Sequence, residues 1–252
     1  MSGRLAIVGL GPGPAAWMTP EASAEIEAAS DVVGYGPYLA RLNVRAGQRA
    51  HASDNRAELE RARLALKLAE KGASVAVVSG GDPGVFAMAA AVFEAAEESP
   101  QWRTLDIAVV PGVSAMLAAA ARLGAPLGHD FCAISLSDNL KPWGVIEKRL
   151  RAAAEADFVI AIYNPASKGR PTRIADAFAL LRDVKNGATA VAFARAIGRP
   201  DETLTLGTLA NADLGAVDMA TLVIVGSSQT RFIPREGARP WMLTPRAYGA
   251  GR

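Results

Sequence analysis

The 252-residue sequence is poor in the residue types that build metal centres and covalent cross-links. It has one cysteine, Cys132, and two histidines, His51 and His129, far apart in the chain. One thiol cannot close an internal disulfide or hold an iron–sulfur cluster. Two distant histidines without a paired-cysteine motif argue against structural zinc. We therefore expect no metal or iron–sulfur cluster, and a protein of the reducing cytoplasm.

Long apolar runs and an excess of charge of one sign are also missing. The N-terminal apolar run is interrupted by glycines after a few residues, so neither a signal peptide nor a membrane span is expected. The 27 basic and 25 acidic side chains nearly balance, which argues against nucleic-acid binding. Half of the residues are hydrophobic, as in globular proteins, and the length allows one large or two small domains.

Short β-branched runs alternate with alanine-rich stretches of helical periodicity. The expected strands are nearly all apolar, which is typical of strands buried on both faces. They cover residues 5–11, 31–35, 73–81, 105–112, 132–138, 158–165, 190–198, 203–209 and 220–228. Thr19 followed by Pro20 predicts the start of the first helix. The alternation predicts an α/β fold of two α/β domains with mostly parallel sheets covered by helices.

The stretch LGAPLGHD, residues 123–130, breaks this alternation with several turn-forming residues. We place the domain boundary there and expect an N-terminal domain over 1–124 and a C-terminal domain over 125–240. Residues 241–252, in a segment rich in proline, arginine and glycine, are expected to form a surface tail. A short polar turn between the last two expected strands indicates an antiparallel portion in the second sheet.

The turn GLGPGP after the first strand superficially resembles a dinucleotide-binding turn. Such a turn needs a third glycine and free backbone amides facing a pyrophosphate. Here Pro14 stands at the third glycine position, and Pro12 and Pro14 have no amide hydrogen. The next strand, DVVGY, ends without the carboxylate that would bind a ribose. Taken alone, the turn is therefore interpreted as a tight strand-to-helix connection or, less readily, as a phosphate cradle.

Three further loops follow expected strands, at the carboxyl ends where open α/β sheets bind ligands. They are SGGDPGVF (79–86), PGVSAM (111–116) and YNPASKGRPTR (163–173). With these four turns in this order, the chain resembles the tetrapyrrole methylases over almost its whole length, from IVGLGPG to LVIVGSS. Within that family, VVGYGPYL, SLSDNLKPW and IAIYNPASKGR are most similar to the enzymes that methylate precorrin-3B at C17.

This resemblance implies a reaction and a set of partners. The expected reaction is S-adenosylmethionine-dependent methylation of precorrin-3B at C17 with ring contraction, giving precorrin-4 in cobalamin (vitamin B12) biosynthesis. The cosubstrate is expected in a cleft between the two domains and leaves as S-adenosylhomocysteine. A homodimer is expected, both from the family and from the apolar segment that contains Tyr35, Tyr38 and Leu39.

The resemblance also assigns site residues. Those expected to contact the cosubstrate are Pro12, Gly81, Asp82, Val85, Ser114, Ala115, Tyr163 and Ala196. Those expected to contact the macrocycle are Gly11, Gly13, Lys168, Arg170, Arg173 and Arg195, because the substrate carries carboxylate arms that arginine binds bidentately. Ring contraction needs a proton acceptor and a donor to a developing oxyanion, for which Asp138, Tyr35 and Lys141 are the candidates.

Each assignment has a structural alternative. Asp82 with Pro83 is also a common turn, Ser114 and Asp138 could cap helices, and the arginines could form a solvated face. Val85 and Ala115 could simply be packing residues. Other functions also stay open: methylation of another precorrin carbon or of cobalt-factor III, NAD(P)-dependent oxidoreduction, and non-catalytic tetrapyrrole binding.

Overall fold

The structure is a computed structural model that describes residues 3–54, 57–167 and 169–247. The chain forms two compact units, Met1–Ala115 and Met116–Arg252. The division falls earlier than the boundary expected after residue 124, because helix α5 (Ala115–Leu123) is bonded to the second unit. Arg122 forms an ion pair with Glu202, and the Arg122 carbonyl accepts a hydrogen bond from Arg239.

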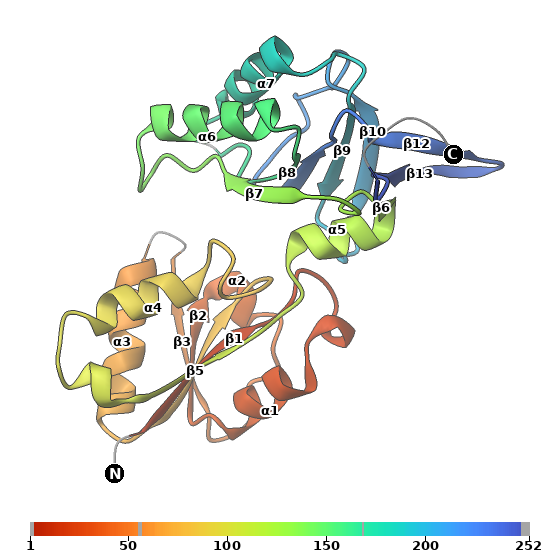
Figure 1. Ribbon diagram of the computed structural model, residues 1–252. Helices are drawn as coiled ribbons and strands as arrows, with labels where there is room; N and C mark the ends of the chain where they lie inside the picture. Colours follow the sequence, from red (N-terminus) through yellow and green to blue (C-terminus); the bar gives the residue numbers. More distant parts are fainter. Residues whose placement is uncertain (1–2, 55–56, 168, 248–252) are drawn as a thin grey trace. The chain divides into compact units, whose positions relative to one another are not determined.

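The first unit is a parallel sheet covered by helices on both faces (Figure 1). Its strands are β1 (Arg4–Gly9), β2 (Asp31–Tyr35), β3 (Arg49–Ser53), β4 (Ser74–Ser79) and β5 (Asp106–Val110). Its helices are η1 (Ala15–Trp17), α1 (Pro20–Ala28), α2 (Gly36–Leu39), α3 (Glu58–Glu70), α4 (Met88–Ala96) and η2 (Trp102–Thr104). The strand order is β3-β2-β4-β1-β5, and every pairing is parallel.

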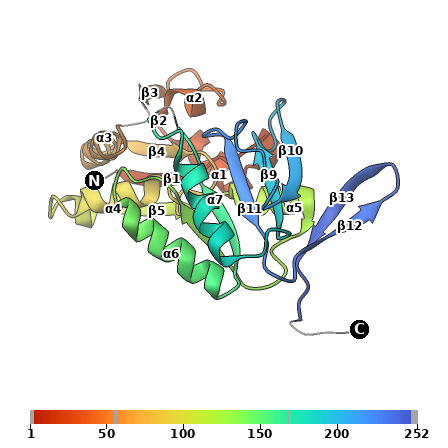
Figure 2. The same cartoon turned by 90° about the horizontal axis from the view of Figure 1, so that it is seen from above.

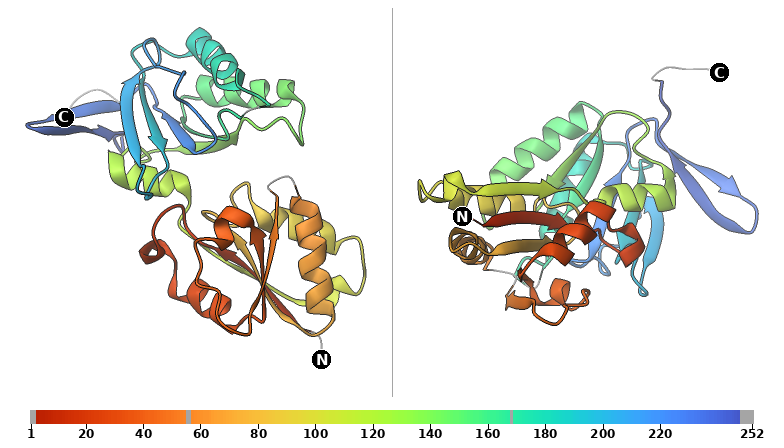
Figure 3. Two further views of the ribbon diagram at one scale, coloured as in Figure 1. Left: turned by 180° about the vertical axis from the view of Figure 1, so that it is seen from behind. Right: turned by 90° about the horizontal axis from the view of Figure 1, so that it is seen from below.

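Two apolar cores lie on opposite faces of this sheet. Leu5 and Ile7 of β1 pack with α3 and α4, whereas Ala6 and Val8 pack with α1 and the end of α2. Successive side chains of a strand point to opposite faces, so a strand buried on both sides must be apolar throughout. Figure 3 shows α1 and α3 on the two sides of the sheet.

The first helix begins as predicted. The Thr19 hydroxyl accepts a hydrogen bond from the Ala22 amide at 3.1 Å, and Pro20 is the first helical residue. Strand β3, with the sequence RAHAS, was not predicted, because it is polar and lies at the edge of the sheet.

The second unit contains a mixed sheet with the order β10-β9-β11-β8-β7. Its elements are β7 (Phe131–Ser135), α6 (Trp143–Glu155), β8 (Val159–Tyr163), α7 (Arg173–Val184), β9 (Ala190–Arg195), β10 (Thr203–Thr208) and β11 (Thr221–Val225). Strands β7 and β8 are parallel, and the other pairings are antiparallel. The predicted antiparallel portion is confirmed. However, β10 and β11 do not pair with each other; they lie on the two sides of β9.

A small third sheet corrects two predictions about the end of the chain. Strands β12 (Arg231–Arg235) and β13 (Ala238–Leu243) form a hairpin, visible in Figure 2, and β13 also pairs with β6 (Gly124–Ala125). The expected tail over 241–252 is therefore partly wrong, because Met242 and Thr244 are buried. The expected linker around residue 124 is itself a strand. In the described ranges six strand pairings are parallel and four antiparallel, which agrees with the predicted fold class.

A buried carboxylate stabilises the amino-terminal end of β2. Asp31 has no exposed side-chain surface and accepts hydrogen bonds from Arg49 at 2.9 and 2.8 Å. It also contacts the Nε2 atom of His51 at 2.8 Å and the Ser30 hydroxyl at 2.8 Å. Burial by itself raises the pKa of Asp31, but these hydrogen bonds outweigh it and lower the pKa to about 2.

We expect Asp31 to make the protein sensitive to acid. Its pKa in an unfolded chain is about 3.9, so the lower folded pKa contributes roughly 2 kcal/mol of stability above about pH 4. This contribution is lost as the pH falls toward about 2. Asp31→Asn should lower the free energy of unfolding at neutral pH and flatten its acid dependence, measured by urea unfolding between about pH 2 and 7. Asp106→Asn is the control, because its exposed ion pair with Arg4 should contribute less than about 1 kcal/mol. Equal losses in the two variants would contradict this account.

Candidate functional site

Three glycine-containing loops of the first unit meet at the carboxyl ends of β1, β4 and β5. A Cβ atom on Gly9 would lie 2.7 Å from the backbone nitrogen of Gly112 and 2.9 Å from the carbonyl oxygen of Gly81. A Cβ atom on Gly112 would lie closer still to that oxygen. The backbones of the loops are therefore in direct contact, which only residues without a Cβ atom allow.

Asp82 connects two of these loops. One of its carboxylate oxygens accepts a hydrogen bond from the Gly84 amide at 2.8 Å, within its own loop. The other accepts from the Gly112 amide at 3.0 Å, in the loop after β5. The ordinary turn considered for Asp82 is present, but the second bond gives this side chain an additional role in holding the site together.

Two amides of the GLGPG turn are bonded within the first unit. Leu10 donates its N–H to the Ser79 carbonyl at 2.9 Å, and Gly11 donates to the Gly81 carbonyl at 3.1 Å. Pro12 and Pro14 have no N–H to offer. A pyrophosphate bound by this turn would need several of these donors, so the geometry disfavours the dinucleotide reading.

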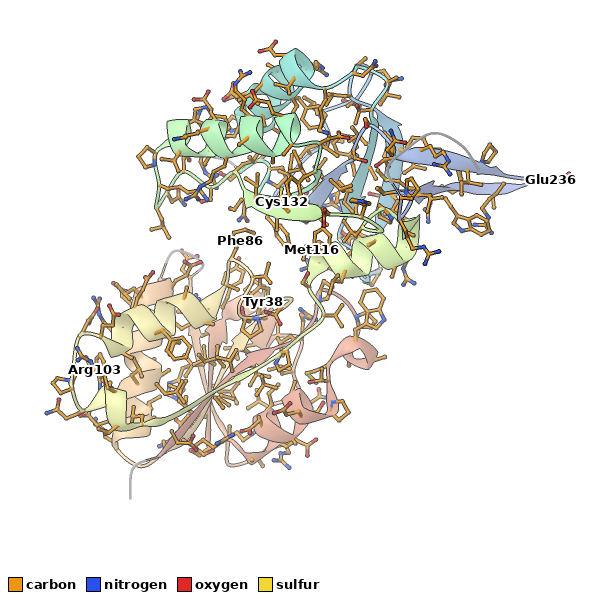
Figure 4. All side chains as sticks on the ribbon, in the orientation of Figure 1. Tyr38, Phe86, Arg103, Met116, Cys132 and Glu236 are labelled. Atoms are coloured by element: carbon orange, nitrogen blue, oxygen red, sulfur yellow. The ribbon has the colours of Figure 1, made fainter. Side chains whose placement is uncertain are left out.

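The aromatic segment after β2 packs inside the first unit. The rings of Tyr35 and Tyr38 are 5.3 Å apart in an edge-to-face arrangement. A Cβ atom on Gly80 would lie 2.6 Å from the Tyr38 ring, and Leu39 is buried. Figure 4 shows Tyr38 and Phe86 toward one end of this unit and Arg103 toward the other. Tyr38 and Leu39 therefore serve the fold, and the segment by itself no longer argues for a dimer surface.

In the second unit, Tyr163 is the last residue of β8, and Asn164 follows it. The Tyr163 hydroxyl accepts a hydrogen bond from the Met116 amide in the first turn of α5 at 3.1 Å. Asn164 donates from its side chain to the Ser135 hydroxyl at 2.9 Å. These bonds join the end of β8 to α5, and the residue after β8 to the end of β7.

Strained backbone occurs where the site residues were predicted. Phe86, Asn164 and Ala196 have φ angles of 53°, 51° and 51°, a region that residues with a Cβ atom rarely occupy. Asn164 and Ala196 immediately follow β8 and β9, and Phe86 lies in the loop after β4. Such residues cluster at functional sites, where the surrounding structure maintains the strain. Asp157 is also left-handed, at φ 58°, but it follows the end of α6, where this conformation is ordinary.

The predicted substrate-binding arginines are engaged by carboxylates. Arg173 donates to Asp138 at 2.9 and 2.6 Å and to Asp176 at 3.2 Å. Arg170 lies 3.4 Å from the same Asp138 carboxylate. The solvated basic face is thus wrong for these two residues, whose charge is paired within the unit.

The remaining predicted substrate cations differ in their surroundings. Arg195 pairs with Asp201 and Asp218, both at 2.9 Å. Lys168 lies outside the described residues. A substrate carboxylate that binds Arg195 or Arg173 must therefore compete with a protein carboxylate, and the binding roles of these residues stay predictions.

The surroundings of Asp138 and Lys141, two of the predicted catalytic residues, shift their pKa values. Burial by itself raises the pKa of Asp138. The hydrogen bonds from Arg173 and the charges of Arg173 and Arg170 outweigh burial, so the pKa is lowered overall. This makes Asp138 a weak proton acceptor. Burial, with a smaller effect from Arg149, lowers the pKa of Lys141. The proton-transfer roles of both residues stay predictions.

The described residues contain neither a candidate metal site nor a candidate membrane span. No group of three or more His, Cys, Asp or Glu side chains there is arranged to hold a metal ion. No helix there combines the length and apolar character needed to cross a membrane.

Comparison with known proteins identifies the family. Residues 4–213 match the model of the Tetrapyrrole (Corrin/Porphyrin) Methylases. The chain belongs to the tetrapyrrole methylases. This confirms the family predicted from the four turns and their order.

Several tetrapyrrole methylases resemble this chain over its whole length. The chain is 57% identical to a precorrin-3B C(17)-methyltransferase from Sinorhizobium sp over 249 residues, 98% of each protein. It is 44% identical to a probable cobalt-factor III C(17)-methyltransferase from Salmonella typhimurium, over 97% of this chain and 99% of that protein. It also matches half of the longer cobalamin biosynthesis protein CobIJ of Mycobacterium tuberculosis, with 49% identity.

Solved structures of tetrapyrrole methylases confirm the fold. The crystal structure of the methyltransferase CobJ has a TM-score of 0.93 and 49% identity, over 97% of this chain and all of that one. A uroporphyrin-III C-methyl transferase from Thermus thermophilus, solved with S-adenyl homocysteine, has a TM-score of 0.65 at 24% identity, over 89% of this chain and 92% of that one.

One residue bonded to the predicted site, Arg41, was missed by sequence reasoning. Its guanidinium contacts the carbonyls of the GLGPG turn. Nothing in the sequence around it, YLARLN, forms a motif, because the contact joins segments about thirty residues apart.

Because the three loops touch at Gly9 and Gly112, we expect that adding one methyl group at Gly112 lowers both stability and ligand binding. Gly112→Ala should force the loops after β1, β4 and β5 apart, costing about 1–3 kcal/mol of stability and weakening S-adenosylhomocysteine binding. Urea unfolding and titration calorimetry measure the two effects. Gly36→Ala is the matched control, because a Cβ atom there would have no neighbour within 4 Å. Normal binding by Gly112→Ala would show that the loops tolerate separation.

Proposed function

We propose that this chain methylates precorrin-3B at C17 with S-adenosylmethionine and contracts the ring, giving precorrin-4 in cobalamin biosynthesis. The observation that carries the proposal is the 57% identity, over 98% of both chains, to an enzyme named precorrin-3B C(17)-methyltransferase. Identity to the cobalt-factor III enzyme is lower, at 44%, so we favour the metal-free substrate.

The geometry of the first unit supports a nucleoside site formed by backbone. We propose that Pro12, Gly81, Asp82, Val85, Ser114 and Ala115 contact the cosubstrate, with Tyr163 and Ala196 contributing from the second unit. Gly81, with φ 72°, and the glycines around it let main-chain groups approach a ligand closely. Because the Leu10 and Gly11 amides already donate to Ser79 and Gly81, this arrangement suits a sulfonium nucleoside better than a dinucleotide.

Methyl transfer requires little chemistry from the protein. The C–S bond to the methyl group breaks as a C–C bond forms at C17, and the electron pair stays on sulfur. No protein nucleophile takes part, so the chain's main task is to align the two reactants and exclude water. For ring contraction we propose Lys141 and Tyr35 as proton-transfer and oxyanion-binding groups, and retain Asp138 chiefly for its ion pairs with the arginines.

The decisive experiment is a single-turnover incubation with precorrin-3B and methyl-labelled S-adenosylmethionine, with cobalt-factor III in a parallel reaction. We expect one labelled methyl group at C17 of a contracted ring, identified by mass spectrometry and NMR. Transfer only to cobalt-factor III, or to another carbon, would replace this proposal with a related one. Binding of the tetrapyrrole without transfer would indicate a non-catalytic protein, and binding of NADH instead of S-adenosylhomocysteine would indicate an oxidoreductase.

Substrate binding by the arginines can be distinguished from their ion pairs within the protein, because the first is measured by KM and the second by the free energy of unfolding. We propose that Gly11, Gly13, Lys168, Arg170, Arg173 and Arg195 contact the macrocycle. Arg173→Ala should raise the KM for precorrin-3B about ten- to a hundredfold, because a charge-assisted hydrogen bond contributes roughly 1.5–3 kcal/mol. Arg173→Lys should recover part of this, since it restores charge but not the fork geometry.

Arg182→Ala is the control for this measurement. Arg182 lies on the same helix, α7, and donates to the Leu209 carbonyl at 2.9 Å. An unchanged KM in Arg173→Ala, together with a lower free energy of unfolding, would assign Arg173 to the ion pair with Asp138 alone.

A homodimer in the cytoplasm completes the proposal. It now rests on the family resemblance, because Tyr38 and Leu39 are used within the first unit. Light scattering at micromolar concentration and moderate salt should give the mass of two chains. The mass of one chain under these conditions would contradict it.

A further inference from the structure

Arg41 bonds to the main chain of the GLGPG turn at three places. Its Nη2 atom donates to the carbonyl oxygens of Leu10 at 3.3 Å, Gly11 at 3.1 Å and Gly13 at 2.7 Å. All three acceptors belong to one turn, and one nitrogen reaches them all. The guanidinium is thus a clamp on this turn rather than a partner of a single group.

The chain holds Arg41 in place through the short helix α2. Tyr38 packs against Gly80, and Leu39 is buried in the core beside α1. The Arg41 amide donates to the Tyr38 carbonyl at 3.1 Å, and Leu42 donates to Leu39 at 3.0 Å. The residues on both sides of Arg41 are therefore fixed to the first unit, and the aromatic segment after β2 serves to place this side chain.

The polarity of the turn explains the need for a cation. The Leu10 amide donates to Ser79 at the end of β4 and the Gly11 amide to Gly81 in the loop after it, whereas Pro12 and Pro14 have no N–H. The carbonyls of Leu10, Gly11 and Gly13 converge instead, so their partial negative charges repel one another. A guanidinium offsets this repulsion, and it stays charged at every physiological pH.

We propose that Arg41 is a positioning residue, which holds the GLGPG turn in the conformation that receives the cosubstrate and the macrocycle. The inference rests on the proposed function, because Gly11, Pro12 and Gly13 are proposed to contact those two molecules. Arg41 acts through the turn and needs no contact with the reacting atoms.

The test compares Arg41→Ala and Arg41→Lys with Arg45→Ala. Arg45 lies four residues further along and also donates to a main-chain carbonyl, that of Glu27, at the end of α1 and away from the turn. Three quantities are measured: the Kd of S-adenosylhomocysteine by calorimetry, kcat and KM with the natural substrates, and hydrogen exchange of the peptide that contains Leu10 and Gly11.

Arg41→Ala should raise the Kd about tenfold to a hundredfold, as expected for a lost charge-assisted hydrogen bond, and speed exchange in the turn. Arg41→Lys should restore part of the affinity, because an ammonium group also donates to carbonyls. Millimolar methylguanidinium should partly rescue Arg41→Ala and leave Arg45→Ala unchanged. The KM for S-adenosylmethionine should rise with the Kd, whereas general destabilisation would affect both alanine variants.

The outcomes separate this inference from the proposed function. If the wild-type protein fails to methylate precorrin-3B but binds S-adenosylhomocysteine, the proposed reaction is wrong while the Kd series still decides the role of Arg41. If the wild type does not bind S-adenosylhomocysteine, exchange decides: faster exchange confined to the turn of Arg41→Ala supports the clamp. Affinity and exchange in Arg41→Ala equal to those of Arg45→Ala would overturn it.

Discussion

Direct contact between three backbone segments is the constraint on which the site depends. Strands β4, β1 and β5 are neighbours in the first sheet, so the loops that leave their carboxyl ends must share one edge. Gly9 and Gly112 let those loops touch, and Asp82 bonds the second loop to the third. A ligand at this edge meets main-chain atoms whose positions are set by the sheet, which suits a reaction that depends on alignment.

The first turn occupies the same topological position as a dinucleotide-binding turn but has the opposite polarity. In a dinucleotide site the amides face outward toward phosphate. Here the Leu10 amide donates to Ser79 at the end of β4, the Gly11 amide donates to Gly81 in the next loop, and the carbonyls of the turn face Arg41. The two prolines, which have no amide hydrogen, are consistent with this reversal.

Several arginines bind specific oxygen atoms within the protein and do not form an exposed basic surface. Arg61 is buried, with only 4% of its surface exposed, and donates to the Ser53 hydroxyl and the Asp54 carbonyl at 2.8 and 2.6 Å. Burial lowers its pKa. Arg173 and Arg195 each bind two carboxylates. The net charge is only +2 because 25 acidic side chains nearly balance 27 basic ones, and some of those acids are the partners of these arginines.

The sequence by itself determined the alternation of strands and helices and the loops at the strand ends, because these follow from local patterns of apolar residues, glycine and proline. The family followed from the resemblance of its motifs to those of the tetrapyrrole methylases. It missed β3, β12 and β13, because their residues do not form the apolar runs of the other strands and become strands by pairing with neighbours. It placed the domain boundary after α5, whereas the structure divides the chain before most of that helix. The contacts of α5 with the second unit form only in the folded protein and leave no pattern in the local sequence. The partners of Asp138, Arg41 and Tyr163 lie 28 or more residues away along the chain. Only the tertiary structure decided these hydrogen-bond partners, because the sheets bring together loops that are distant in the sequence.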